Sequence, residues 1–190
     1  AQNLWPGKEG RFTGESSAWM LAQMCQFVII GHSDRRVHQG EDNRLINQKV
    51  KAALRFGLRP IVCVGEFRRL TPDASGQLKA RRGDVASDIF VQLRDAIAGL
   101  AADELSQVVI AYEPVWAMSG VSGGQVADLH YTEQVIQQLR VALDTYVGKK
   151  VAHQVSVIYG GSVSAATADR FAHLEHLDGV LVGSESLKAK

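Results

Sequence analysis

Five short apolar runs alternate with longer segments of helical spacing, and this alternation constrains the fold more than any other feature of the sequence. The runs are nearly continuous in apolar residues, whereas a strand with one wet face alternates apolar and polar positions. Runs of this kind are typical of parallel strands covered on both faces. The sequence therefore predicts a parallel sheet between helices, with strands at residues 27–30, 60–64, 108–112, 155–159 and 180–182.

The intervening segments place their apolar residues three and four positions apart, as on one face of an α-helix. One such stripe lies within residues 45–54, and Gly57 stands where a helix C-terminal glycine belongs. Two further stripes lie within residues 85–97 and 135–146. Strand and helix alternating at this pitch predict βα units with right-handed crossovers. The pattern fits an open doubly wound sheet and a barrel equally well.

The composition indicates one ordinary globular domain. A length of 190 residues suits a single core, and no repeat, linker or biased tract divides it. The hydrophobic fraction of 46% and charged fraction of 22% exclude disordered classes, and the net charge of +1 argues against a nucleic-acid partner. Residues 35–82 carry an excess of positive charge, which indicates a field for anionic substrates or solvated helix faces. For most of these side chains we favour the solvated faces.

The sequence also bears on the cellular compartment. No apolar run approaches the ~20 residues of a membrane-spanning helix, and the N-terminus shows no basic stretch followed by an apolar one. Cys25 and Cys63 lie in apolar contexts without metal-ligand spacing, which favours buried free thiols in a reducing compartment. We therefore expect a cytoplasmic protein without a membrane partner.

Polar residues gather just beyond the carboxyl ends of the predicted strands, where parallel α/β folds place their functional groups. These positions hold His32, Glu113 and two glycine-bearing loops at residues 160–162 and 183–184. Glycines let backbone N–H groups approach a phosphate, and helix N-termini opened by such loops favour its charge. Taken singly, His32 could be a core histidine and Glu113 a surface carboxylate. Together the groups suit proton transfer on a small phosphorylated carbonyl compound.

Seven motifs, in order, carry a family resemblance: AQNLW, FTGE, VIIGHSDRR, VCVGE, AYEPVWA, IYGGSV and DGVLVGSESL. The sequence resembles the triosephosphate isomerases over nearly all of its length. The resemblance implies a TIM-barrel fold of the (β/α) type, without cofactor or metal. It implies a glycolytic and gluconeogenic isomerase that interconverts dihydroxyacetone phosphate and glyceraldehyde 3-phosphate through an enediolate. This family pairs a glutamate base with a neutral histidine under a closing loop.

The resemblance also implies roles for individual residues. Glu113 is expected to be the base that moves a proton between neighbouring carbons, and His32 the electrophile that polarises the carbonyl. A histidine at the start of a helix is biased toward its neutral form, which agrees with that role. The implied substrate- and phosphate-binding residues are Ser119, Ser162, Gly183 and Ser184.

A mobile lid is a further implication of the resemblance. It would span residues 114–124, with its first hinge at residues 114–116 and a latch formed by Tyr159 and Ser162. Trp116 in that hinge has a second interpretation as a hydrophobic plug.

The sequence departs from the family pattern at several places. It begins where the family's third strand ends, so the first two βα units, with a substrate-binding asparagine and lysine, have no counterpart. The C-terminal segment is short, and residues 1–190 are expected to form a single partial TIM-barrel domain of about six of eight units. Asp34 replaces a family glutamate, and residues 118–122 lack the usual lid sequence. Glu185 follows Ser184 where the family has Gly-Ala, which places an anion beside the anion site unless Glu185 points outward.

Three hypotheses about function follow. The chain is an active isomerase, a non-catalytic or weakly active relic with a residual anion site, or a fragment that works only with another chain. An open sheet edge between residues 27–30 and 180–182 favours association. Residues 3–15 resemble the family's dimer loop, so we predict a homodimer or larger assembly. His173 and His176 could share a helix face as metal ligands, but without a third ligand nearby we expect a solvated face.

Overall fold

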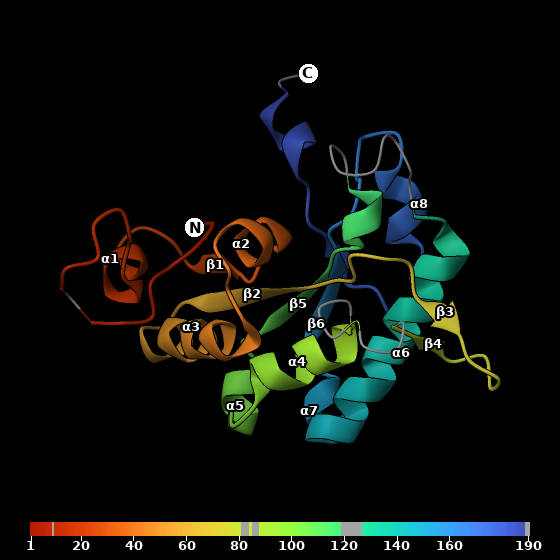
Figure 1. Ribbon diagram of the computed structural model, residues 1–190, viewed down its shortest axis with the longest axis horizontal. Helices are drawn as coiled ribbons and strands as arrows, with labels where there is room; N and C mark the ends of the chain where they lie inside the picture. Colours follow the sequence, from red (N-terminus) through yellow and green to blue (C-terminus); the bar gives the residue numbers. More distant parts are fainter. Residues whose placement is uncertain (9, 81–83, 85–87, 119–126, 189–190) are drawn as a thin grey trace.

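The centre of the molecule is a five-stranded parallel sheet whose strand order follows the order of the chain (Figure 1). The computed structural model describes residues 1–190 except residues 9, 81–83, 85–87, 119–126 and 189–190. Along the sheet, β1 pairs with β2, β2 with β5, β5 with β6, and β6 with β7. The strands are β1 (Phe27–Ile30), β2 (Arg59–Val64), β5 (Val109–Tyr112), β6 (Ser156–Tyr159) and β7 (Gly179–Val180).

Helices follow the strands, as the periodicity predicts. The α-helices are α1 (Ala18–Ala22), α2 (Ser33–His38), α3 (Asn43–Arg55), α4 (Ile89–Ile97), α5 (Ala102–Leu105), α6 (Leu129–Val147), α7 (Lys149–Ala152) and α8 (Ala168–Ala172). Two short 3₁₀ helices are η2 (Val115–Ala117) and η3 (Ser184–Leu187), and a hairpin pairs β3 (Thr71–Pro72) with β4 (Leu78–Lys79). Helix α3 begins after Asp42, whose carboxylate accepts the Leu45 N–H, and ends before Gly57 at φ 76°.

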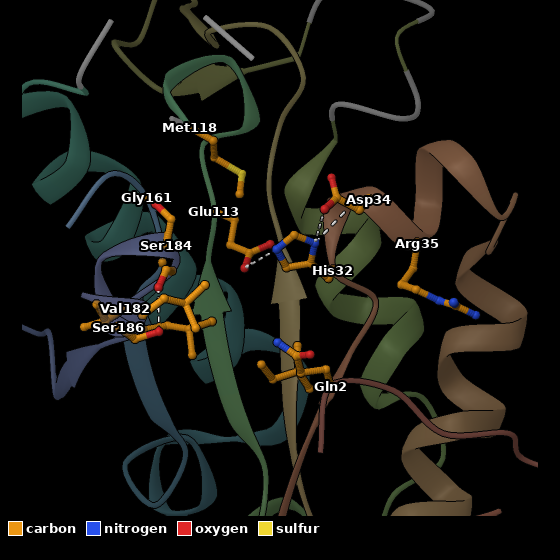
Figure 2. Close-up of a pocket in the computed structure, with 15 residues that line it drawn as sticks. Gln2, His32, Asp34, Arg35, Glu113, Met118, Gly161, Val182, Ser184 and Ser186 are labelled. Carbon is orange, nitrogen blue, oxygen red and sulfur yellow. Dashed lines mark hydrogen bonds and ion pairs between the residues drawn. The ribbon is translucent and has the colours of Figure 1, made fainter. Parts of the chain in front are cut away.

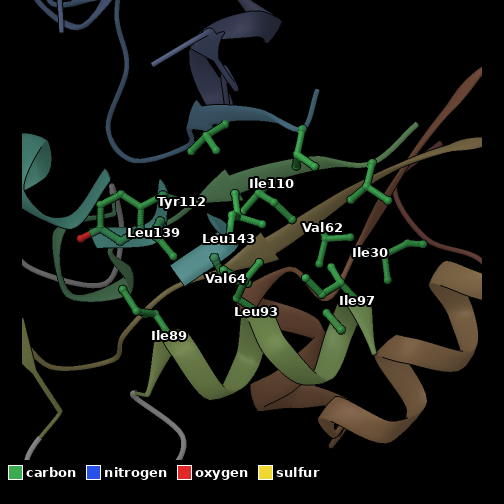
Figure 3. Close-up of a cluster of buried hydrophobic side chains, with 14 of the residues drawn as sticks. Ile30, Val62, Val64, Ile89, Leu93, Ile97, Ile110, Tyr112, Leu139 and Leu143 are labelled. Carbon is green, nitrogen blue, oxygen red and sulfur yellow. The ribbon is translucent and has the colours of Figure 1, made fainter. Parts of the chain in front are cut away.

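The core lies between the sheet and the helices α3, α4 and α6 (Figure 3). Ile30, Val62 and Ile110 come from three neighbouring strands, while Leu93 of α4 and Leu139 of α6 face them. All five side chains are fully or almost fully buried. Most residues of the predicted helical stripes are therefore buried, although Tyr146 at the end of the third stripe is 40% exposed. Of the stripe at 85–97, residues 85–87 lie outside the described part of the chain.

The sheet is open. In the described residues, β1 and β7 each pair with only one strand, and the N-terminal residue extends along the outer edge of β1. Ala1 donates its amino group to the Phe27 carbonyl at 2.7 Å and accepts the Ile29 N–H at 2.9 Å. The α/β class and the incomplete barrel are therefore confirmed. Strand β7 ends at Val180, two residues before the predicted run does, and only the Leu181 N–H continues its pairing with β6.

No helix in the described ranges combines the length and apolar character needed to cross a lipid bilayer.

Candidate active site

His32 stands at the N-cap of α2, just beyond the end of β1. Gly31, at φ 73°, turns the chain from strand into helix. The ring nitrogen Nδ1 accepts the Asp34 backbone N–H at 3.2 Å. A nitrogen that accepts a hydrogen bond carries no proton, so the neutral ring has its proton on Nε2. Nε2 faces Glu113 (Figure 2).

Glu113 follows β5 and is buried, with 2% of its surface exposed. Its backbone N–H donates to the Val64 carbonyl at 2.9 Å, and its Oε1 lies 3.7 Å from His32 Nε2. Burial raises the pKa of Glu113, and the neighbouring His32, Cys63 thiol, Ser33 N–H and Arg36 lower it in part. A carboxylate with a raised pKa is a stronger base than an exposed one, which suits proton abstraction.

Two glycines give Glu113 the space it occupies. A Cβ on Gly65 would lie 1.7 Å from the Glu113 carbonyl oxygen, so β2 and β5 approach closely only with glycine there. A Cβ on Gly160 would lie 2.9 Å from the Glu113 Cγ, inside contact distance. Gly160 belongs to the predicted phosphate loop, and its packing against the base is a second role that the sequence did not predict. The family motifs contained the glycines, but their neighbours became visible only in the fold.

An open pocket of about 420 Å³ lies in front of the two side chains (Figure 2). Its walls include the two predicted glycine loops, through Gly160, Gly161, Gly183 and Ser184. The prediction that helices open directly from these loops is wrong in part. Helix α8 begins only at residue 168, and the segment after Gly183 is the four-residue 3₁₀ helix η3. An anion at these loops would therefore be bound by their backbone N–H groups, without the added field of a long helix.

The predicted latch residues lie on β6 and in the loop after it. Tyr159 is fully buried, with its ring stacked on Phe171 at 4.2 Å, and Ser162 donates its hydroxyl to the Ala117 carbonyl at 2.9 Å. Ser162 is therefore bonded to the segment that follows Glu113. The predicted phosphate ligand Ser119 and most of the predicted lid lie outside the described residues.

Glu66 organises the other side of the Glu113 segment. Its Oε1 accepts hydrogen bonds from the hydroxyls of Tyr112 at 2.9 Å and Tyr131 at 2.8 Å, and from Trp116 Nε1 at 2.7 Å. Burial raises the pKa of Glu66, and these donors lower it in part. Trp116 is therefore more than a hydrophobic plug, because its indole donates to a buried carboxylate, and its place in a hinge stays a prediction. The available sequence signal was an acidic residue two positions after the end of a buried strand.

Two departures from the family pattern, Asp34 and Glu185, lie near the site and differ in their relation to it. The Asp34 side chain is 70% exposed and belongs to the pocket lining. Its backbone N–H donates to His32 Nδ1, and its carboxylate lies 3.7 Å from the same nitrogen. Glu185 pairs with Lys188 and does not line the pocket. The anion beside the predicted phosphate site therefore points outward.

His173 and His176 do not form a metal site in the described structure. His173 lies 3.5 Å from Asp169, and His176 lies 3.8 Å from Glu175, both as exposed pairs. The described residues contain no group of three or more potential His, Cys, Asp or Glu ligands.

A carboxylate and an imidazole beyond the carboxyl ends of a parallel sheet are the arrangement that (β/α)-barrel enzymes use. A family model described as triosephosphate isomerase matches residues 1–190, and the chain belongs to this family. It is 40% identical over 190 residues to the triosephosphate isomerase of Dehalococcoides mccartyi strain BAV1, covering all of this chain and 69% of that protein. The triosephosphate isomerase of Acetivibrio thermocellus is 40% identical over 189 residues, covering 99% of this chain and 70% of that protein. For the Chloroflexus aurantiacus triosephosphate isomerase the identity is 40%, with coverages of 100% and 71%.

Proposed function

We propose that the chain interconverts dihydroxyacetone phosphate and glyceraldehyde 3-phosphate by proton transfer through an enediolate. The observation that carries the proposal is the pairing of Glu113 and His32 at 3.7 Å on one wall of the pocket. The relatives that are named triosephosphate isomerase support the choice of substrate.

The two side chains have complementary tasks in this reaction. Glu113 removes a proton from the carbon next to the carbonyl, and the electrons of that C–H bond move toward the carbonyl oxygen. His32 stabilises the resulting oxyanion through Nε2–H, the only N–H group of the neutral ring. Glu113 then returns the proton to the former carbonyl carbon. The hydroxyl proton of the substrate passes to the former carbonyl oxygen by way of His32, so the other oxygen becomes the new carbonyl and no atom is gained or lost.

The loops at residues 160–162 and 183–184 hold the phosphate group. Their glycines expose backbone N–H groups, and Ser184, which lines the pocket, adds a hydroxyl. The Ser162 hydroxyl is bonded to the Ala117 carbonyl, so Ser162 is proposed as a phosphate ligand on the basis of the resemblance alone. Anchoring the non-reacting end of the substrate fixes the reacting carbons in front of the base. Ser119 is proposed as a further ligand on the basis of the resemblance alone.

One observation favours a weaker second function, that of a relic with a residual anion site. Arg35 is the only cationic side chain among the described lining residues of the pocket. It points away from His32 (Figure 2) and binds Glu41 at 2.7 Å and Glu15 at 3.7 Å. Among the lining residues that the structure describes, a developing enediolate therefore meets no free cation. If the relic interpretation holds, the chain binds phosphate or sulfate but turns over little substrate.

We also propose that the chain forms a homodimer through residues 3–15. Within this segment Trp5 packs on Phe12 with ring centroids 4.5 Å apart, yet Phe12 remains 42% exposed. On the adjacent α1 and the turn after it, Trp19 is 52% and Met24 76% exposed. Large apolar side chains gathered in this way are typical of an interface.

A coupled isomerisation assay on the purified 190-residue chain tests the proposed function. Glu113→Gln removes the base but preserves its shape, and we expect activity to fall ~10²–10⁴-fold. Glu175→Gln, an exposed carboxylate beyond the site, is the matched control and should retain the parent rate. Equal turnover in the parent and Glu113→Gln would reject the mechanism. An inactive parent that still binds sulfate would favour the relic.

A further inference from the structure

One arginine joins the ends of the two strands that lie beside the proposed acid–base pair. Arg36 lies on α2, one turn after His32, and each of its three guanidinium nitrogens donates one hydrogen bond. Nε donates to the Gly31 carbonyl at 2.8 Å, and Nη2 to the Cys63 carbonyl at 3.0 Å. Nη1 donates to Asn43 Oδ1 at 2.8 Å. Gly31 directly precedes His32, so the contact reaches the backbone that orients the imidazole.

The third bond extends this connection to the helix layer. Asn43 is the first residue of α3, and its Nδ2 donates to Asp95 of α4 at 3.1 Å. The guanidinium of Arg36 is therefore fixed from the strand side and from the helix side. The three acceptors lie around a planar guanidinium, and each is reached by a different nitrogen. A lysine carries all of its donors on one nitrogen and cannot reach the three together.

The same guanidinium is a fixed positive charge near the base. Glu113 is faced by His32 and Ser33 of α2, by the Cys63 thiol of β2 and by Arg36. Arg36 is in turn faced by Cys63, Glu113 and Glu41. Burial lowers the pKa of Arg36, but these groups raise it in part, and the guanidinium stays charged. Its charge lowers the pKa of Glu113 against the larger effect of burial.

We propose that Arg36 is a positioning residue of this site. By bridging the carboxyl ends of β1 and β2, it fixes the positions of His32 and Glu113 relative to each other. The inference rests on the proposed function for its role in turnover. Arg36 does not line the pocket that contains His32 and Glu113, so its effect falls on the placement of these groups and not on substrate contacts. Misplacement by ~1 Å can cost ~10²-fold in rate, and we therefore expect kcat to fall and KM to change little.

Nuclear magnetic resonance of the substrate-free chain tests the geometry without turnover. The variants are Arg36→Met, which removes charge and bonds, and Arg36→Lys, which keeps only the charge. Arg44→Met, on the exposed face of α3, is the control. We expect the Glu113 titration midpoint to move to higher pH in Arg36→Met, because a cation near the carboxylate is lost. We expect the His32 ring nitrogen shifts to change in both variants of Arg36 and not in the control.

Two results would overturn the proposal. One is a folded Arg36→Met whose Glu113 midpoint and His32 shifts match the parent. The other is an Arg36→Lys variant that matches the parent in its His32 shifts, and this comparison decides the matter if the methionine variant does not fold.

Kinetics separate the inference from the proposed function. We expect kcat of Arg36→Lys to fall ~10-fold or more, with KM within about twofold of the parent. A lysine variant with the parent kcat would count against Arg36. A parent chain without isomerase activity would reject the proposed function alone, because the resonance measurements need no turnover.

Discussion

Ser162 and Ala117 are joined by a 2.9 Å hydrogen bond from the serine hydroxyl to the alanine carbonyl. Ser162 belongs to the loop after β6, and Ala117 ends η2, which begins two residues after Glu113. This hydrogen bond therefore connects the proposed anion loop to the segment that follows the proposed base.

This bond leads to a kinetic prediction. Ser162→Ala removes one hydrogen bond worth about 0.5–1.5 kcal/mol, so we expect kcat/KM to fall about 2- to 10-fold. Steady-state kinetics measure the change. Ser106→Ala, which removes a hydroxyl bonded to Asp103 on α5, is the control and should leave kcat/KM at the parent value. A Ser162→Ala variant as active as that control would contradict the assignment.

Glu113 should make the fold less stable as pH rises. Burial raises its folded-state pKa above the ordinary value, so the folded protein binds the proton more tightly than the unfolded chain does. Stability is then greatest below the ordinary pKa and is lost as pH rises through the raised one. Glu113→Gln removes this cost, so we expect about 0.5–2 kcal/mol of added stability at pH 8 and none at pH 4. Urea unfolding at both pH values measures it, and an equal gain at pH 4 would contradict the assigned cause.

Glu66 should matter more for stability than a single buried carboxylate. Glu66→Ala leaves two tyrosine hydroxyls and the Trp116 indole without their acceptor, and we expect a loss of about 3–5 kcal/mol. Glu66→Gln keeps an acceptor oxygen of the same shape and should lose clearly less. Chemical denaturation of both variants distinguishes the two. Equal losses would mean that the charge, and not the shared acceptor, is what the cluster needs.

Sulfate should bind at the loops 160–162 and 183–184, on backbone N–H groups. Because Glu185 pairs with Lys188 outside the pocket, we expect Glu185→Gln to change the sulfate affinity less than about twofold. Melting temperatures in a sulfate series provide the affinity. Tightening by an order of magnitude in Glu185→Gln would show that this carboxylate faces the anion.

Association can be tested at the exposed aromatic segment. We expect Phe12→Asp to shift the chain toward the monomer in light scattering, since it places a charge in the proposed interface. Val141→Asp, on an exposed position of α6, is the matched control and should leave the mass unchanged. A parent that is already a monomer, with a melting temperature independent of concentration, would contradict the homodimer.

The sequence alone could predict the layers and the location of the site. Near-continuous apolar runs identified the five strands of the sheet, and strand ends of a parallel sheet share one edge, so His32 and Glu113 had to lie near each other. The sequence could not predict that Arg36 donates hydrogen bonds to carbonyls at the ends of β1 and β2. Nor could it predict that the Tyr131 hydroxyl donates to Glu66, 65 positions away in the chain. Such contacts depend on side-chain direction between elements, which periodicity does not encode. The helices after the two anion loops were misplaced because glycine marks a turn without fixing where the next helix starts.

Because the strand order of the sheet matches the order of the chain, the sheet can assemble strand by strand during synthesis. Each strand of the sheet pairs with one that has already left the ribosome, so the sheet can grow by local additions without waiting for a distant partner. His32 and Glu113 come together once β5 has docked on β2, whereas Gly183 and Ser184 arrive only after β7. In the nascent chain, the proposed acid–base pair would thus come together before both of the proposed phosphate loops are present.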